Sequence, residues 1–384
     1  MREPAVTASA SELVSGARRV VVKIGSSLLF DARSGGPDTH RFETLAAALA
    51  GWRTRGIETV LVSSGAVALG RGRLKLPAGR LALDQKQAAA AAGQTALMMA
   101  WNTALEPHGI PAAQALLTFD DMESRRRWLN ARATLDALLA AGALPVINEN
   151  DTVATAELRY GDNDRLAARV AQMCDADLLI LLSDVDGLYS ADPSRVPDAR
   201  LIAHVAAITP DIEALGGEPG KAGTGTGGMA SKIAAARIAA RAGIATIIAA
   251  GAEDDPLDRL TKGAPHTVFA PETSRTTARR NWISGAVAPR GTLYLDAGAV
   301  AAIRSGKSLL PAGIAQVEGG FSRGETVALA DPDGAVLAKG ITAYGADELR
   351  RIAGLRSADI EAILGYRRGV AAIHVNDLVL EGQA

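Results

Sequence analysis

Two polar clusters lie close together near the middle of the 384-residue chain. The first, Asn148–Asp151, follows directly after an apolar run that we expect to be a strand, Leu144–Ile147. The second, Asp162–Asp164, comes directly before a stretch of helical periodicity, and Asp and Asn are good capping residues. Carboxylates and amides at strand ends and helix starts are typical of a polar substrate pocket in an α/β enzyme. Two capped turns on a solvated surface are the alternative.

Two lysines stand where a phosphate site would need them. Lys23 lies near the end of an apolar run, directly before a Gly-Ser-Ser turn whose backbone N–H groups can surround a phosphate. Lys232 lies in the first turn of a predicted helix, behind a glycine-rich loop that begins at Gly216 and matches neither a Walker A motif nor a Rossmann fingerprint. A cation at the positive end of a helix costs up to about 1 kcal/mol unless an anion compensates it. A lysine at a strand edge and a plain surface loop are the alternatives.

These residues need a scaffold that brings them together. Strand-like runs alternate with helical segments, which predicts a mainly parallel sheet sandwiched by helices. Ligands of such sheets bind beyond the carboxyl ends of the strands, where Lys23, Ser64 and Asn148–Asp151 all fall. The predicted strands are Arg19–Ile24, Thr59–Val62, Ile110–Leu117, Leu144–Ile147, Ala176–Leu182 and Ile244–Ala249. The predicted helices are His40–Arg55, Asp84–Glu106 with an interruption at Gly93, Trp128–Ala141 and Met229–Ala242.

The two ends of the chain have a different character. Residues 1–17 lack the apolar core of a signal peptide, and we expect a loose, flexible tail there. Residues 276–289 contain two arginines and a proline, and we interpret them as a linker. From residue 290 to 384 helices are few and short β-like runs separated by glycines dominate, which predicts a small β-rich barrel. Those runs are Thr292–Leu295, Ala315–Val317, Thr326–Leu329, Val336–Gly340 and Ala371–Val375.

Composition limits the function classes. Apolar residues make up 48% of the chain, enough for a large core, and 41 basic residues balance 42 acidic ones. A protein that binds nucleic acid through its phosphates normally has a basic surplus. Cys174 is the single cysteine, so no internal disulfide forms, and we expect it to be a small buried side chain. No apolar run approaches the roughly 20 residues of a membrane span, and we expect a cytoplasmic protein without membrane contact.

Beyond these patterns, the chain resembles the bacterial glutamate 5-kinases, which are amino acid kinases with a C-terminal PUA domain. The resemblance covers nearly the whole chain, with a kinase domain at 18–275 and a PUA domain at 290–384. It is carried by VVVKIGSSLL, VSSGAVALG, PVINENDTVATAE, YGDND, GTGTGGMASK, LLPAGI and LRRIAG. PVINENDTVATAE together with GDND is the most specific pair. Ser63 and Ser183 stand where the family more often has threonine, and both keep a hydroxyl.

The resemblance implies a role for each matched residue. Lys23 and Lys232 would contact the ATP phosphates and stabilise transfer, and Asp164 would orient both lysines. Glutamate would be held by Ser64, Asn148, Asp151, Asp162 and Asn163. ATP would be bound by Lys23, Ser183, Asp184, Thr226, Gly227, Gly228, Met229, Ala230, Ser231 and Lys232. Phosphate-bound Mg²⁺ would accompany ATP, without an assigned protein ligand.

The implied activity is phosphorylation of the side-chain carboxylate of L-glutamate, the first step of proline biosynthesis. The family further implies a homo-oligomer, a dimer or tetramer, and feedback inhibition by proline. One alternative is a kinase of the same fold that acts on aspartate, acetylglutamate, carbamate or UMP. The other is an RNA-binding PUA protein, but residues 289–384 carry no basic surplus, so we expect no RNA binding.

Overall fold

The structure is a computed structural model that describes residues 8–31, 33–77, 79, 81–154, 163–217, 228–275, 277–278, 289–366 and 369–381. The chain forms two compact units. The first extends to Thr273 apart from residues 124–129, and the second contains those residues and the chain from Ser274 onward. Most of the predicted linker, 276–289, lies outside the described residues.

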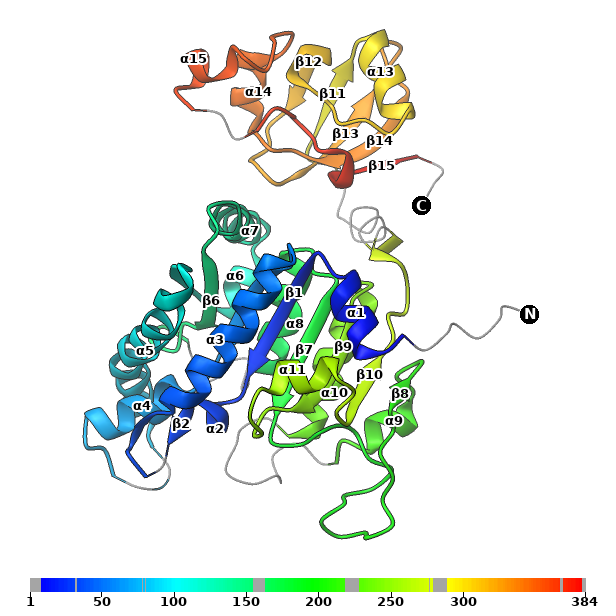
Figure 1. The fold of residues 1–384 in the computed structure, drawn as a ribbon. Coiled ribbons are helices and arrows are strands. Elements are labelled where there is room, and N and C mark those ends of the chain that lie inside the picture. The colour runs from blue at the N-terminus through cyan, green and yellow to red at the C-terminus, as the bar shows by residue number, and fades with distance from the viewer. Residues whose placement is uncertain are drawn as a thin grey trace. The chain divides into compact units, whose positions relative to one another are not determined.

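An eight-stranded sheet is the middle layer of the first unit (Figure 1). Its strand order is β5-β6-β4-β1-β7-β9-β10-β8, and each neighbouring pair is parallel except β9 with β10. The predicted mainly parallel sheet is therefore confirmed. The strands are β1 (Arg19–Ile24), β4 (Glu58–Ser63), β5 (Ala112–Leu117), β6 (Leu144–Glu149), β7 (Leu178–Ser183), β8 (His204–Val205), β9 (Ala245–Ala250) and β10 (His266–Phe269).

Helices cover both faces of this sheet, as predicted. Helices α3 and α11 lie over one face, while α8 and α10 pack side by side on the other (Figure 1). The helices of this unit, to which α7 belongs from residue 130 onward, are α1 (Ala10–Gly16), α2 (Ser26–Leu29), α3 (Thr39–Thr54), α4 (Ala66–Arg73), α5 (Leu83–Leu105), α6 (Phe119–Glu123), α7 (Arg125–Ala140), α8 (Asn163–Met173), α9 (Pro210–Ala214), α10 (Met229–Arg241) and α11 (Pro256–Thr261). Two small elements are the hairpin β2 (Phe30–Asp31) with β3 (Gly36–Pro37) and the 3₁₀ turn η1 (Glu106–His108).

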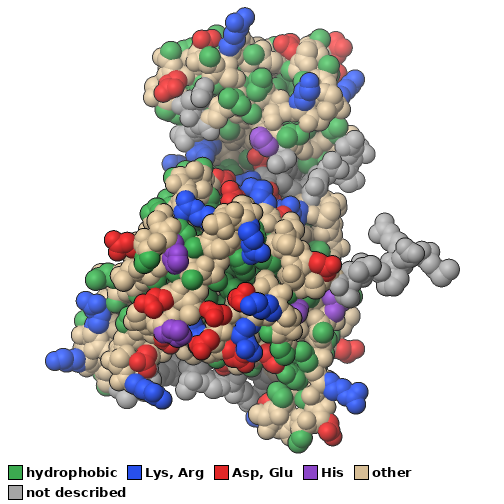
Figure 2. Space-filling model, viewed as in Figure 1, with side chains coloured by type: hydrophobic (Ala, Val, Ile, Leu, Met, Phe, Trp, Pro, Cys, Tyr) green, Lys and Arg blue, Asp and Glu red, His purple; other side chains and the backbone are tan. Residues whose placement is uncertain are grey.

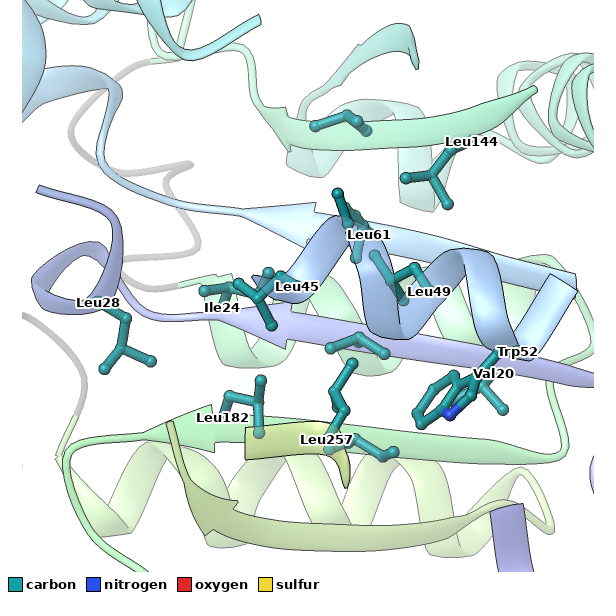
Figure 3. Packing of buried hydrophobic residues seen from close by; sticks show 14 of the residues in the cluster. Val20, Ile24, Leu28, Leu45, Leu49, Trp52, Leu61, Leu144, Leu182 and Leu257 are labelled. Carbon is teal, nitrogen blue, oxygen red and sulfur yellow. The ribbon is translucent and has the colours of Figure 1, made fainter. Parts of the chain in front are cut away.

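The position of Lys23 in strand β1 determines the face of the sheet on which its side chain lies. Val20, Val22 and Ile24 join the core under α3, together with residues such as Leu45 (Figure 3). Successive side chains of a strand alternate between the two faces of the sheet. Lys23 therefore faces the opposite side, where α8 packs on β1. A strand that is buried along its whole length thus delivers the charged Lys23 to the α8 side.

Residues 10–16 correct the expected N-terminal tail, because they form α1. Ser9 accepts a hydrogen bond from the Glu12 backbone N–H and the Glu12 carboxylate accepts one from the Ser9 backbone N–H, which is a capping box. Ala10 and Val14 bury themselves in the core. The Ser-x-x-Glu spacing was present in the sequence as a helix signal.

Helix α5 runs unbroken from Leu83 to Leu105, so the predicted interruption at Gly93 is wrong. Gly93 instead allows α5 to touch α4. A Cβ on Gly93 would lie 1.8 Å from the carbonyl oxygen of Ala66, and one on Gly70 would lie 1.7 Å from that of Ala89. Two glycines, one in each helix, therefore let the backbones pack directly on each other.

We expect Gly93→Ala to destabilise the protein by about 1–3 kcal/mol or more, because the added methyl group overlaps backbone that cannot give way. Gly51→Ala is the matched control, since Gly51 lies inside α3 and a Cβ there would meet nothing within 4 Å. Alanine is the better helix former, so this change should stabilise by up to about 1 kcal/mol. Urea unfolding of both variants measures the two effects; equal midpoints would contradict the packing argument.

Cys174 lies between α8 and β7 and is fully buried, so the expected buried side chain is confirmed. Burial raises the pKa of its thiol to about 12. The thiol therefore stays protonated and unreactive at neutral pH.

The second unit is built on a five-stranded sheet with the order β12-β11-β13-β14-β15. Adjacent strands of this sheet are antiparallel, except that β11 and β13 are parallel. The predicted β-rich character of this region is confirmed, although Ala371–Val375 makes only a single bridge, from Ile373 to Leu309, and the last strand follows it. The elements are β11 (Gly291–Leu295), α13 (Ala297–Arg304), η2 (Pro311–Gly313), β12 (Ile314–Gly319), β13 (Thr326–Ala330), β14 (Val336–Ile341), α14 (Ala346–Ile352), α15 (Ile360–Leu364), η3 (Val375–Asp377) and β15 (Leu378–Leu380).

The surface carries both signs of charge. Figure 2 shows acidic and basic side chains interspersed on the face it presents, in keeping with a formal net charge of −1. Within the described ranges, no helix is both long and apolar enough to cross a membrane.

Candidate active site

A buried carboxylate joins two lysines from separate elements. Asp164, in the first turn of α8, is completely buried. Its Oδ1 lies 2.5 Å from Lys23 Nζ of β1, and its Oδ2 lies 3.2 Å from Lys232 Nζ of α10. The lysine side chains are only 8% and 5% exposed. The structure therefore brings together the three residues for which a catalytic role was implied.

This lysine–carboxylate cluster combines one carboxylate with two lysines. Burial alone would raise the pKa of Asp164, but the ammonium groups of Lys23 and Lys232 outweigh it and lower that pKa. The carboxylate is therefore ionised at neutral pH and faces two ammonium groups. Lysine ammonium groups commonly bind phosphate in proteins, so the cluster is suited to an anionic ligand.

The start of α10 adds to this preference for anions. Its N-cap is Gly228, which offers no capping side chain, and the helix places Lys232 in its first turn. Helix N-termini carry partial positive charge and favour phosphate groups. Gly228, Met229, Ala230 and Ser231, all predicted ATP-binding residues, form this helix start.

A chain of amides adjoins the cluster. Asn163, the neighbour of Asp164, points its Nδ2 at three acceptors: the Ser63 carbonyl oxygen at 3.0 Å, Ser64 Oγ at 2.9 Å and Asn148 Oδ1 at 2.8 Å. An amide nitrogen has only two hydrogens, so these acceptors share them. The contacts tie the ends of β4 and β6 to the start of α8. Ser64, Asn148 and Asn163, three of the predicted glutamate-binding residues, thus lie together.

Gln94 extends this network and was missed in the sequence. It lies in the middle of α5, and its Oε1 accepts a hydrogen bond of 3.0 Å from Asn148 Nδ2. It lies in no recognisable motif, and its position beside β6 depends on the packing of α5. No signal in the sequence distinguishes it from the other polar residues of this helix.

A cavity of about 260 Å³ opens beside the amide network. It lies between α5, β5 and the end of β6. Asn148 and Asp151 of the predicted site line it, as do Gln94, Gln114 and Glu149. Its size and polar lining suit a small polar molecule.

A second cavity, of about 440 Å³, lies between α8 and α10. Phe119, Arg165, Arg169 and Arg237 line it, as does Ala230 of the predicted ATP site. Neither lysine of the cluster nor any amide of the network borders it. Of these two cavities, it is the smaller that borders the amide network.

The remaining predicted residues divide into two groups. Ser183 ends β7 beside the end of β1, and its Oγ donates a hydrogen bond of 2.9 Å to Asp184 Oδ1. Asp162, Thr226 and Gly227 lie outside the described residues. No group of three or more His, Cys, Asp or Glu residues that could hold a metal ion occurs in the part of the chain that the structure describes.

Comparison with known proteins decides the family. The model of the amino acid kinase family matches residues 18–250, and that of the PUA domain matches residues 291–364. The chain belongs to the amino acid kinase family. It is 55% identical over 363 residues to glutamate 5-kinase 1 of Rhizobium meliloti (strain 1021), covering 94% of this chain and 92% of the relative.

Other relatives of this amino acid kinase agree. It is 54% identical over 369 residues to glutamate 5-kinase of Paramagnetospirillum magneticum, covering 96% of this chain and 99% of the relative. It is 52% identical over 376 residues to glutamate 5-kinase of Caulobacter vibrioides, covering 98% and 100%. The similarity therefore extends over both units of the chain.

Proposed function

We propose that the protein transfers the γ-phosphoryl group of ATP to the side-chain carboxylate of L-glutamate, giving ADP and L-glutamyl 5-phosphate, as the first step of proline biosynthesis. The observation that carries the proposal is the Asp164 carboxylate held between Lys23 and Lys232, directly adjoining an amide network beside a small polar cavity. The relatives named glutamate 5-kinase support this acceptor over aspartate, acetylglutamate, carbamate or UMP.

For this reaction the protein must position the two substrates and supply positive charge. A glutamate side chain has a reference pKa of about 4.3, so its carboxylate is already ionised and no general base is required. A carboxylate oxygen attacks the γ-phosphorus in line, and the bond to the bridging oxygen of ADP breaks and leaves its electrons on ADP. The obstacle is the repulsion between two anions, which the ammonium groups of Lys23 and Lys232 offset.

Each half of the site has a defined task in this proposal. Ser183, Asp184 and residues 226–232 bind ATP, and the lysines hold its phosphates. Ser64, Asn148, Asp151, Asp162 and Asn163 hold glutamate. Asp164 keeps both ammonium groups in place and remains ionised in doing so.

Magnesium fits as a companion of ATP. The one fully buried carboxylate of the cluster already binds two lysines, so it is not a free ligand for a metal ion. Mg²⁺ commonly retains water and binds nucleotide phosphates with few protein ligands. Bound in this way, it would neutralise charge on the phosphates.

Asp151→Ala should raise the KM for glutamate about 10- to 100-fold with a smaller effect on kcat, because a bond to a charged group contributes about 1.5–3 kcal/mol. Asp151 lines the cavity, and its carboxylate suits the substrate ammonium. Steady-state kinetics at saturating ATP measures the change. Asp198→Ala, at an exposed aspartate, serves as the control. An unchanged KM in Asp151→Ala would remove this residue from the substrate site.

A coupled ADP-release assay tests the proposed function. We expect rapid turnover with L-glutamate, at least 100-fold slower turnover at about equal concentrations of aspartate or N-acetylglutamate, and inhibition by added proline. Glutamate-independent ADP release, or a preference for another acceptor, would overturn the assignment.

A further inference from the structure

Gln94 carries a buried polar group without a partner. The residue is only 8% exposed, and its Nε2 makes no hydrogen bond to any described residue. Leaving a buried donor unsatisfied costs about 1–3 kcal/mol. Gln94 also lines the 260 Å³ cavity, so a ligand in that cavity could satisfy the group.

The hydrogen-bond network determines which end of the Gln94 amide is free. Two backbone groups with unambiguous roles orient it: the Ser63 carbonyl oxygen accepts from Asn163, and the Glu149 N–H donates to Asn148. Asn163 must therefore present Nδ2, and Asn148 must present Oδ1 to both Asn163 and Glu149.

The other end of the Asn148 amide then determines the orientation of the Gln94 amide. Asn148 donates a hydrogen bond from Nδ2 to Gln94, so the Gln94 atom that faces it must be the acceptor Oε1. The amide group left over on Gln94 is Nε2, a donor. Flipping any one amide of the chain would set two donors or two acceptors against each other. The cavity wall therefore carries a donor at this position.

The occupant of the cavity must supply an acceptor close to an ammonium group. The cavity wall contains the donor-bearing Gln94 and the carboxylate of Asp151. An α-amino acid carries a carboxylate and an ammonium on one carbon and matches this pair. The phosphoryl acceptor, by contrast, must lie by Lys23 and Lys232, which do not border the cavity.

We propose that Gln94 Nε2 binds the α-carboxylate of the amino-acid substrate and thereby determines specificity for a free α-carboxylate. The inference rests on the proposed function, because it takes glutamate to be the substrate whose other carboxylate is phosphorylated. Gln94 holds Asn148 with its carbonyl oxygen and the substrate with its amino group. It thus couples the order of the amide network to recognition of the substrate's α-end.

The test pairs a variant with a substrate analogue. L-Isoglutamine retains the γ-carboxylate but has a neutral amide in place of the α-carboxylate. Gln94→Glu keeps an oxygen for Asn148 and loses the donor, and Gln94→Met has no donor in any protonation state. We measure kcat/KM for glutamate and isoglutamine with the wild-type protein, both variants and Gln172→Glu. Gln172 is a half-buried glutamine of α8 outside the cavity, and its variant is the matched control.

We expect the wild-type protein to prefer glutamate over isoglutamine at least tenfold in kcat/KM. In both Gln94 variants the glutamate KM should rise about 10- to 100-fold and the preference should shrink by about tenfold, since one charge-assisted bond is lost. The KM for ATP should stay unchanged in the Gln94 variants. The Gln172→Glu variant should keep the wild-type preference for glutamate over isoglutamine.

The ratio of kcat/KM for glutamate to kcat/KM for isoglutamine distinguishes a loss of α-carboxylate recognition from a general loss of structure. A general loss of structure would lower both kcat/KM values together and leave their ratio unchanged. The wild-type protein could turn over glutamate while the Gln94 variants keep the wild-type preference for glutamate over isoglutamine. That result would overturn this inference and leave the proposed function standing. No glutamate turnover by the wild-type protein would overturn the proposed function and this inference with it.

Discussion

Lys232→Ala is expected to lower kcat about 10²- to 10³-fold, the loss typical when one preorganised charge stabiliser is removed. The ammonium group lies 3.2 Å from Asp164 Oδ2 and supplies half of the positive charge of the cluster. Without it, only the ammonium group of Lys23 remains beside Asp164, so less positive charge stabilises the phosphoryl group in the transition state. Steady-state kinetics at saturating ATP and glutamate measures the effect.

Lys262→Ala is the matched control for this variant. Lys262 is an exposed lysine at the end of α11 that pairs with Asp258, and its loss should leave kcat within about twofold because exposed pairs contribute about 0–1 kcal/mol. Circular dichroism should show both variants folded. Near-normal turnover of folded Lys232→Ala would remove this lysine from the catalytic cluster.

Asp164→Asn is expected to destabilise the protein by about 3–5 kcal/mol, because breaking a buried ion pair leaves uncompensated charge inside. In this variant two buried ammonium groups lose the carboxylate between them. Urea unfolding without ligand measures the loss. ATP should restore part of the stability, since its phosphates supply the missing negative charge. An unfolding midpoint equal to that of the wild-type protein would contradict the central place given to Asp164.

The lowered pKa of Asp164 also predicts how the stability of the protein depends on pH. Its pKa in the folded protein lies below the ordinary value of 3.8, so its stabilising effect is complete above that value and is lost as the pH falls through the folded pKa. The stability difference between the wild-type protein and Asp164→Asn should therefore stay constant from about pH 8 to about pH 5 and shrink only below about pH 4.

The parts of this site that follow local rules could be predicted from the sequence. The apolar run of β1 predicts both the strand and, through alternation, a lysine on one face of it. Asn148 at the end of β6 and Asn163 at the start of α8 meet because parallel strands deliver their carboxyl ends to one edge of a sheet.

The parts that depend on packing between distant elements could not be predicted. Gly93 is a helix breaker by local propensity, but it allows α5 to contact α4, and that contact overrides the propensity. Gln94, the next residue, contacts Asn148, which lies 54 residues away in the chain. Near the C-terminus, the run around Ile373 has a β-like composition, but its single bridge to Leu309 adds no strand.

The most direct test of the account traps the product of the transfer. An acyl phosphate reacts with hydroxylamine to give a hydroxamate, which mass spectrometry identifies and locates. With ATP, Mg²⁺, L-glutamate and hydroxylamine, we expect γ-glutamyl hydroxamate in a one-to-one ratio with ADP, and almost none with Lys232→Ala. ADP accompanied by free phosphate without hydroxamate, or a hydroxamate on the α-carboxyl group, would contradict phosphoryl transfer to the glutamate side chain.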